Sequence, residues 1–285
     1  MEQLPRLKAR ISNLEELRNL IRAMRALAAS HVQEAHEALT GIRGYVDVIE
    51  DSIAEVVGLL PETKIPAISQ PSSFGAALIV VCSEHGFVGA FNDRLLDFAA
   101  NSRTPRQRLG VIGQRGAMMA EERGMDVAWS FPMATHVGGV LGVTRRVADD
   151  LAGAATADIV FGRYETGGAY EVVRKTILPL DPELLVETGR HSRPLHHIEP
   201  DKLLQQVASE YLFAEITRAV MESLASENGA RLQVLSAADG NIADKLENLH
   251  REEHTLRQEA ITAELLDVVT GAEAIMGRTA HRSGR

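Results

Sequence analysis

The amino-acid sequence predicts a mixed α/β protein in which long helices at the two ends of the chain enclose a central domain. Three observations support this class: a helical repeat at the beginning of the chain, a longer one at its end, and short apolar runs alternating with helical stretches between them. We expect the helices at 1–60 and 200–278 to pair as a long antiparallel two-helix coiled coil. The domain inserted at 74–182 is expected to be a Rossmann-like α/β domain.

The C-terminal helix is predicted from apolar residues at three- and four-residue steps, in a segment with no proline after Pro200. Unbroken, it would be about 110 Å long. That exceeds the diameter of a compact domain of this size, so part of the helix must project and another element must pack along it. Its apolar positions are Leu204, Val207, Tyr211, Leu212, Ile216, Ala219, Val220, Leu224, Leu235, Ile242, Leu246, Leu249, Leu256, Ile261, Leu265, Val268, Val269, Ala272 and Ile275.

The N-terminal helix is predicted over residues 7–60 from the same spacing, and a repeat of this length without caps is typical of a coiled coil. Gly41 and Gly44 weaken its middle and are expected to mark a bend. Its apolar positions include Leu7, Ile11, Leu14, Leu17, Leu20, Ile21, Met24, Leu27, Ala28, Val32, Leu39, Ile42, Val46, Ile49, Ile53 and Val56.

The central region reads as an alternation of strands and helices, which predicts a parallel sheet with crossover connections. The first strand is the clearest, because AALIVVC is a short continuous apolar run rich in β-branched residues. The segment 182–199 is expected to be a loop. We predict strands at 76–82, 109–112, 125–129, 158–163 and 170–178, and helices at 92–100, 115–123 and 139–155.

Composition excludes several classes of protein. The net charge of −9 argues against nucleic acid as a partner, because phosphate binding needs a basic face. A single cysteine, Cys82, excludes an intrachain disulfide and indicates a reducing compartment. No run of about eighteen uncharged apolar residues is present, so we expect no membrane-spanning helix.

The glycine-containing turn at residues 86–89 (GFVG) lies between a predicted strand and a predicted helix, where a phosphate-binding loop would be found. It lacks both the G-x-G-x-x-G spacing and the Gly-Lys-Ser/Thr ending of a P-loop. A nucleotide-binding α/β enzyme with helical arms is therefore a weaker hypothesis than a tight turn. We expect no cofactor and no small-molecule substrate.

The residues His250, Glu253 and His254 spell H-x-x-E-H, the inverted zincin motif. On a helix the two imidazoles share a face and could both reach a metal ion. A zinc-dependent hydrolase is therefore the alternative function, although a polar stripe on a long exposed helix explains the same residues without a metal. The cluster of His191, His196 and His197 is interpreted as solvated loop, because no carboxylate or cysteine stands at ligand spacing.

Four segments resemble the γ subunit of F-type ATP synthases. They are residues 10–30, with the runs RIS, IRAM and AAS; residues 80–92 (VVCSEHGFVGAFN); residues 225–231 (ASENGAR); and residues 257–265 (RQEAITAEL). The last two, in this order and at this distance from the end, are the most specific. The resemblance covers the whole chain in layout and is loosest in the middle.

The resemblance implies a non-catalytic role as the central rotor shaft. The implied partners are the ring of α and β subunits, the ε subunit and the membrane ring of c subunits, which places the chain on the cytoplasmic side of a bacterial-type inner membrane as a peripheral protein. Five positions match family residues linked to coupling or to contact with β: Met24, Arg231, Arg257, Gln258 and Thr262.

The chain also departs from the family pattern. His31 stands where a lysine is common, and Gln33 and Glu34 replace positive charge just beyond it. These changes suggest a divergent branch, and they leave both ATP synthesis and ATP-driven ion pumping open as its main direction.

Overall fold

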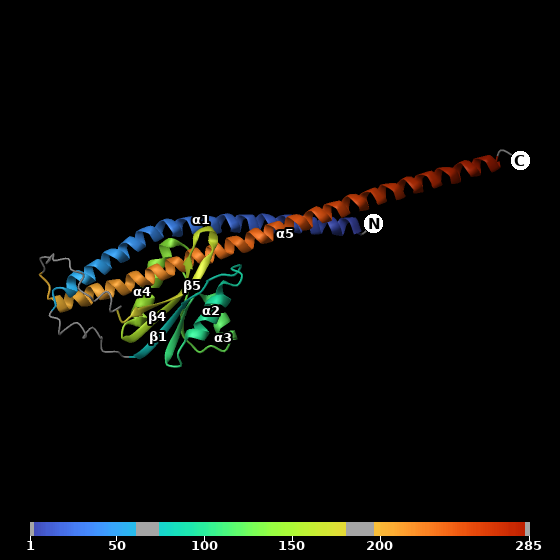
Figure 1. Cartoon of the computed structure of the whole chain (residues 1–285). Helices are drawn as coiled ribbons and strands as arrows, with labels where there is room; N and C mark the ends of the chain where they lie inside the picture. Colours follow the sequence, from blue (N-terminus) through green and yellow to red (C-terminus); the bar gives the residue numbers. More distant parts are fainter. Residues whose placement is uncertain (1–2, 61–73, 181–196, 283–285) are drawn as a thin grey trace. The chain divides into compact units, whose positions relative to one another are not determined.

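The computed structural model describes residues 3–60, 74–180 and 197–282. The chain divides into two compact units. The first unit consists of Met1–Met24 and Leu235–Arg285, and the second is Arg25–Val234. Two long helices, α1 (Gln3–Val57) and α5 (Pro200–Arg282), each have residues in both units, and they confirm the two predicted terminal helices (Figure 1). The predicted loop at 182–199 lies largely outside the described residues, and so do His191 and His196.

The N-terminal helix is not interrupted at the two glycines that are predicted to mark a bend. α1 continues through Gly41 and Gly44 as one helix, and no atom outside the helix lies within 4 Å of a Cβ built at either position. Both glycines therefore face open space, and neither makes the close contact that would require a glycine there. The two glycines therefore lower the stability of the helix only through the low helix propensity of glycine.

The second unit contains one five-stranded sheet with the order β3-β2-β1-β4-β5. β1 pairs in parallel with β2 and β4, and β2 pairs in parallel with β3, so the predicted parallel sheet is confirmed for four strands. β5 is antiparallel to β4, because a short hairpin joins them and a parallel return needs a longer crossover. The strands are β1 (Phe74–Val81), β2 (Gln107–Ile112), β3 (Val127–Phe131), β4 (Ala154–Tyr164) and β5 (Tyr170–Leu178).

Helices cover both faces of this sheet, which explains why β1 is apolar throughout. Leu78 and Val80 pack with α2 (Phe91–Ser102) and α3 (Gln114–Glu122) on one face. Ile79 and Val81 pack with α4 (Val140–Leu151) and with parts of α1 and α5 on the other.

The helix predicted at 139–155 is shorter than expected. It ends at Leu151, because Gly153 adopts a φ of 99° and turns the chain into β4. Glycine takes this left-handed conformation at little cost, whereas most other residues do not.

In the first unit, α1 and α5 contact each other through an apolar cluster formed by Leu7, Ile11, Leu246 and Leu249. The helical spacing did not show which apolar residues would be covered. Leu17, Leu20 and Leu27 of α1 are exposed by 43%, 58% and 58%. On α5, five apolar side chains are more than half exposed: Ile261 (52%), Leu265 (61%), Leu266 (63%), Val268 (64%) and Val269 (54%).

Candidate functional site

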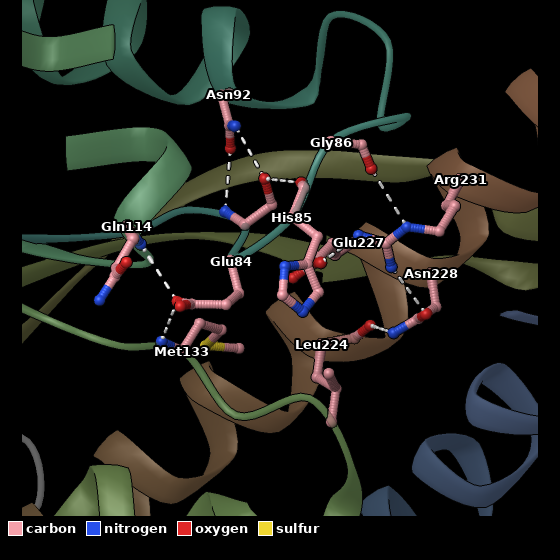
Figure 2. A network of polar contacts seen from close by, with 11 residues as sticks. Glu84, His85, Gly86, Asn92, Gln114, Met133, Leu224, Glu227, Asn228 and Arg231 are labelled. Atoms are coloured by element: carbon pink, nitrogen blue, oxygen red, sulfur yellow. Dashed lines mark hydrogen bonds and ion pairs between the residues drawn. The ribbon is translucent and has the colours of Figure 1, made fainter. Parts of the chain in front are cut away.

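The turn that follows β1 is held by a buried pair of side chains. The Ser83 amide donates to the Asn92 Oδ1 at 2.9 Å, and the Asn92 Nδ2 donates back to the Ser83 Oγ at 2.8 Å. The Ser83 Oγ also donates to the His85 carbonyl at 2.9 Å. Because Asn92 lies in the first turn of α2, these bonds fix the turn against the start of that helix (Figure 2).

One carboxylate joins the segments that follow three parallel strands. Glu84, after β1, accepts the Gln114 amide at 3.1 Å and the Met133 amide at 2.7 Å. Gln114 is the first residue of α3 after β2, and Met133 follows β3. The partial positive charge of a helix N-terminus favours a carboxylate at this place. Figure 2 shows Glu84 between these two donors.

Helix α5 covers the carboxyl ends of the two central strands. The Ser223 Oγ donates to the Val81 carbonyl of β1 at 2.8 Å, and the Ser226 Oγ donates to the Gly162 carbonyl of β4 at 2.9 Å. In a sheet of this order, a nucleotide would bind in the crevice between these two strands, where the strand order reverses. The chain's own helix occupies that crevice here, which favours the tight-turn interpretation of residues 86–89.

The same part of α5 carries a charged group of residues. The Arg231 guanidinium donates to Glu227 Oε1 at 2.5 Å, to Asn228 Oδ1 at 2.9 Å and to the Gly86 carbonyl at 3.3 Å (Figure 2). Glu227 is 3% exposed, and its Oε2 has no hydrogen-bond partner among the described residues. Burial raises the pKa of Glu227 to about 7, the charge of Glu84 adds to this rise, and Arg231 opposes it.

The tip of the turn has an unusual backbone. Phe87 adopts a φ of 61° and is 61% exposed. A bulky residue at positive φ is strained, so the surrounding bonds must hold it in place. Gly89, two residues on, has a φ of 57°, which glycine tolerates. The turn therefore presents an aromatic ring to solvent on a constrained backbone.

The structure places the five family-matched residues in different surroundings. Arg231 belongs to the network described above, and Met24 is half-buried on α1. Arg257, Gln258 and Thr262 are exposed on consecutive turns of α5. There the Arg257 Nη2 donates to Glu253 Oε1 at 3.2 Å, and the Thr262 Oγ1 donates to the Gln258 carbonyl at 2.9 Å.

The H-x-x-E-H residues do not form a recognisable metal centre. The His250 ring lies 3.7 Å from Glu15 Oε1 and 3.7 Å from Glu253 Oε2, and His254 is exposed. Within residues 3–60, 74–180 and 197–282, no three His, Cys, Asp or Glu side chains are grouped as metal ligands. In the first unit His250 and Glu253 face Glu15 and Lys8 of α1, whereas His254 is exposed on α5.

Sequence reasoning did not select Glu84, Asn92 or Glu227 as site residues. Each lies inside a segment that carries the family resemblance, so that segment was the available signal. The sequence did not show that the turn after β1 contacts α5, because the two segments are far apart in the chain.

A family model described as ATP synthase matches residues 3–275. The chain belongs to the ATP synthase family. Within it, the chain groups with the gamma chains, and the zinc-hydrolase alternative finds no support. It is 24% identical to the ATP synthase gamma chain of Lachnoclostridium phytofermentans, over 94% of this chain and 98% of the relative. It is 25% identical to that of Clostridium perfringens, over 94% of this chain and 96% of the relative.

Solved structures share the fold. The rotor of the Euglena gracilis mitochondrial ATP synthase aligns with a TM-score of 0.63 at 12% identity, covering 90% of this chain and 98% of the other. A chain of the central stalk and c-ring structure of the Tetrahymena thermophila mitochondrial ATP synthase aligns with a TM-score of 0.56 at 18% identity, covering 77% of this chain and 99% of the other. None of the helices in the described residues has an apolar stretch long enough to cross a bilayer.

Proposed function

We propose that the chain is the central-stalk, gamma-type subunit of a rotary F-type ATP synthase. In this role it is a rotor shaft that couples ion flow through a membrane ring of c subunits to conformational changes at the catalytic sites of β subunits. The role is non-catalytic, because the nucleotide chemistry belongs to the partner subunits. The family match over residues 3–275 and the gamma chains among the relatives support it.

One observation carries the proposal beyond the comparisons. Residues 261–269 of α5 expose five large apolar side chains, and each is more than half accessible. A run of exposed apolar residues of this kind marks a protein interaction surface. A ring of α and β subunits around the end of the helix would cover it on all sides. The residues are Ile261, Leu265, Leu266, Val268 and Val269.

The shaft itself is proposed to be an antiparallel coiled coil of α1 and α5. In the first unit, Lys8 lies 3.9 Å from Glu253 while Arg18 lies 2.8 Å from Asp239, so residue numbers rise along one helix as they fall along the other. We retain the division into a coiled-coil helix at 1–60, an α/β domain at 74–182 and a coiled-coil helix at 200–278 as part of this proposal.

Coupling requires that different rotor positions favour different states of the β subunits, which is a differential-contact form of allostery. Met24, Arg231, Arg257, Gln258 and Thr262 are proposed to contribute to coupling or to contact β. The exposure of Arg257, Gln258 and Thr262 on one stretch of α5 supports such a contact. The ε subunit and the c-ring are proposed to bind the other end of the stalk, at the cytoplasmic face of a bacterial-type inner membrane.

Co-purification from the native host tests this function. The tagged chain should recover α and β subunits, and Ile261→Asp combined with Leu265→Asp should reduce that recovery, because charge replaces the apolar surface. Leu141→Asp is the matched control, since Leu141 is 56% exposed on α4, belongs to the second unit and is not one of these five residues. The proposal fails if the wild-type chain recovers neither subunit.

A further inference from the structure

A single guanidinium connects α5 to the turn after β1. Arg231 has a side chain that is only 12% exposed, and it donates to Glu227, to Asn228 and to the Gly86 carbonyl. Glu227 supplies the only carboxylate among these three acceptors. Its other oxygen, Oε2, is buried and has no hydrogen-bond partner among the described residues.

We propose that Glu227 is a positioning residue, whose negative charge holds Arg231 against the turn at residues 86–89, and that loss of this charge releases the turn. A guanidinium so far removed from water needs a carboxylate partner, because an unpaired buried charge is costly. With Glu227 neutral, Arg231 would retain only the Asn228 and Gly86 carbonyl oxygens. Movement of its head group towards solvent would then be favoured.

The neighbours of Glu227 make it able to change charge near neutral pH. Burial raises its pKa to about 7; Arg231 opposes this rise through its charge and its hydrogen bond, the charge of Glu84 adds to it, and the backbone amide of Glu84 opposes it. His85 belongs to the same turn and lies beside this group in Figure 2. Burial raises the pKa of the Cys82 thiol, the charge of Glu227 adds to that rise, and Arg123 opposes it. The carboxyl of Glu227 is therefore the group that titrates between Arg231 and Glu84.

The consequence falls on Phe87. The Gly86 carbonyl that Arg231 holds directly precedes this residue, whose left-handed backbone needs support from its surroundings. Release of the carbonyl would let Phe87 leave the strained conformation and move its exposed ring. An effect of this movement on a partner subunit would rest on the proposed function, in which Arg231 is one of the residues assigned to coupling. The local change itself does not depend on it.

Hydrogen exchange of the full-length chain tests the proposal. Protection of the amides in residues 84–90, corrected for intrinsic exchange, should fall about tenfold between about pH 8 and about pH 6. Glu227→Gln should show the low protection at both pH values, and Glu227→Asp should restore protection at the higher pH. Glu215→Gln is the matched control: Glu215 is also buried on α5 with an unpartnered oxygen, but it pairs with Lys175 and Arg218.

Equal protection of residues 84–90 in the wild-type chain and Glu227→Gln at both pH values would overturn the proposal. If that variant does not fold, carboxyl carbon NMR of the wild-type chain gives the midpoint of Glu227 directly. The Arg231 Nε–H signal must then shift with the same midpoint, and an unchanged signal would also overturn the proposal. A chain that passes these tests but recovers no α or β subunits would refute the proposed function alone.

Discussion

Gly229 of α5 and Gly168 of the β4–β5 hairpin pack backbone against backbone. A Cβ placed on Gly229 would lie 2.9 Å from the Gly168 Cα and 3.2 Å from its carbonyl oxygen. Gly168 itself has a φ of +82°. The hairpin tip and the helix can approach this closely because Gly229 lacks a side chain, and glycine at position 168 tolerates the left-handed backbone. The contact fixes the hairpin against the part of α5 that carries Glu227 and Arg231.

The first prediction concerns this contact. Gly229→Ala should lower the free energy of unfolding by roughly 1–3 kcal/mol, because the new methyl group meets backbone atoms that cannot rotate away. Gly240→Ala is the matched control on the same helix, where nothing lies within 4 Å of the added Cβ. That variant should be stabilised by up to about 1 kcal/mol through helix propensity. Urea unfolding of the full chain measures both, and a Gly229→Ala chain as stable as Gly240→Ala would contradict the packing.

Much of the fold follows from local sequence. The helical spacing predicted α1 and α5, and the apolar run that ends at Cys82 predicted the central strand of a parallel sheet. Two features depend on three-dimensional context instead. The short hairpin between β4 and β5 made the last strand antiparallel. Leu17 fits the helical spacing of α1 and is nevertheless 43% exposed. The spacing alone does not show which residues on the apolar face of a helix are covered by its partner helix.

The candidate site was harder to predict for the same reason. Glu84 and Glu227 lie in segments that resemble the family, but neither segment shows that the two carboxylates belong to one site, because that site forms only when α5 covers the carboxyl ends of the strands. Arg231 was selected through the family resemblance, but its bond to the Gly86 carbonyl joins residues that are 145 positions apart. Sequence spacing can find groups that share one helix or one turn, whereas this site assembles from several elements.

The second prediction is a pH dependence of stability caused by Glu227. Its pKa is raised from 4.5 to about 7, so the folded chain binds this proton more tightly than the unfolded chain. The stabilisation is therefore complete below about pH 4.5 and is lost as pH rises to about 7, by roughly 3 kcal/mol. Glu227→Gln cannot titrate, so its stability relative to the wild-type chain should increase over this range. A relative stability independent of pH would show that Glu227 does not titrate as described.

The third prediction concerns Asp239, where two arginines of α1 meet one carboxylate of α5. The Arg18 Nε donates to Asp239 Oδ1 at 2.8 Å, and the Arg22 Nε donates at 3.1 Å. The bond from Arg18 lowers the pKa of Asp239 below its ordinary 3.8, with Arg22 acting in the same direction. Stabilisation by this group is therefore present above about pH 3.8 and is lost as pH falls.

Asp239→Asn should accordingly lower the thermal unfolding midpoint at neutral pH, and its difference from the wild-type chain should shrink in strong acid. Added salt should reduce the difference as well, because the pairs are close to solvent. Asp244→Asn is the control, since Asp244 is an exposed acidic residue on the same helix. Equal midpoints for the two variants at neutral pH would argue against the pairing of α1 with α5 in the first unit.

The last prediction separates coupling from folding at the end of α5. Arg257→Ala combined with Gln258→Ala should leave the unfolding midpoint of the isolated chain nearly unchanged, because an exposed ion pair contributes about 0–1 kcal/mol. In the assembled ATPase the same variant should weaken ATP-driven ion transport relative to ATP hydrolysis. Arg251→Ala is the matched control, because Arg251 also pairs with the glutamate four residues before it, at 2.7 Å, and is likewise exposed. Transport that is equally unaffected in both variants would remove Arg257 and Gln258 from the proposed contact with β, whereas equal losses in both would assign the effect to helix charge in general.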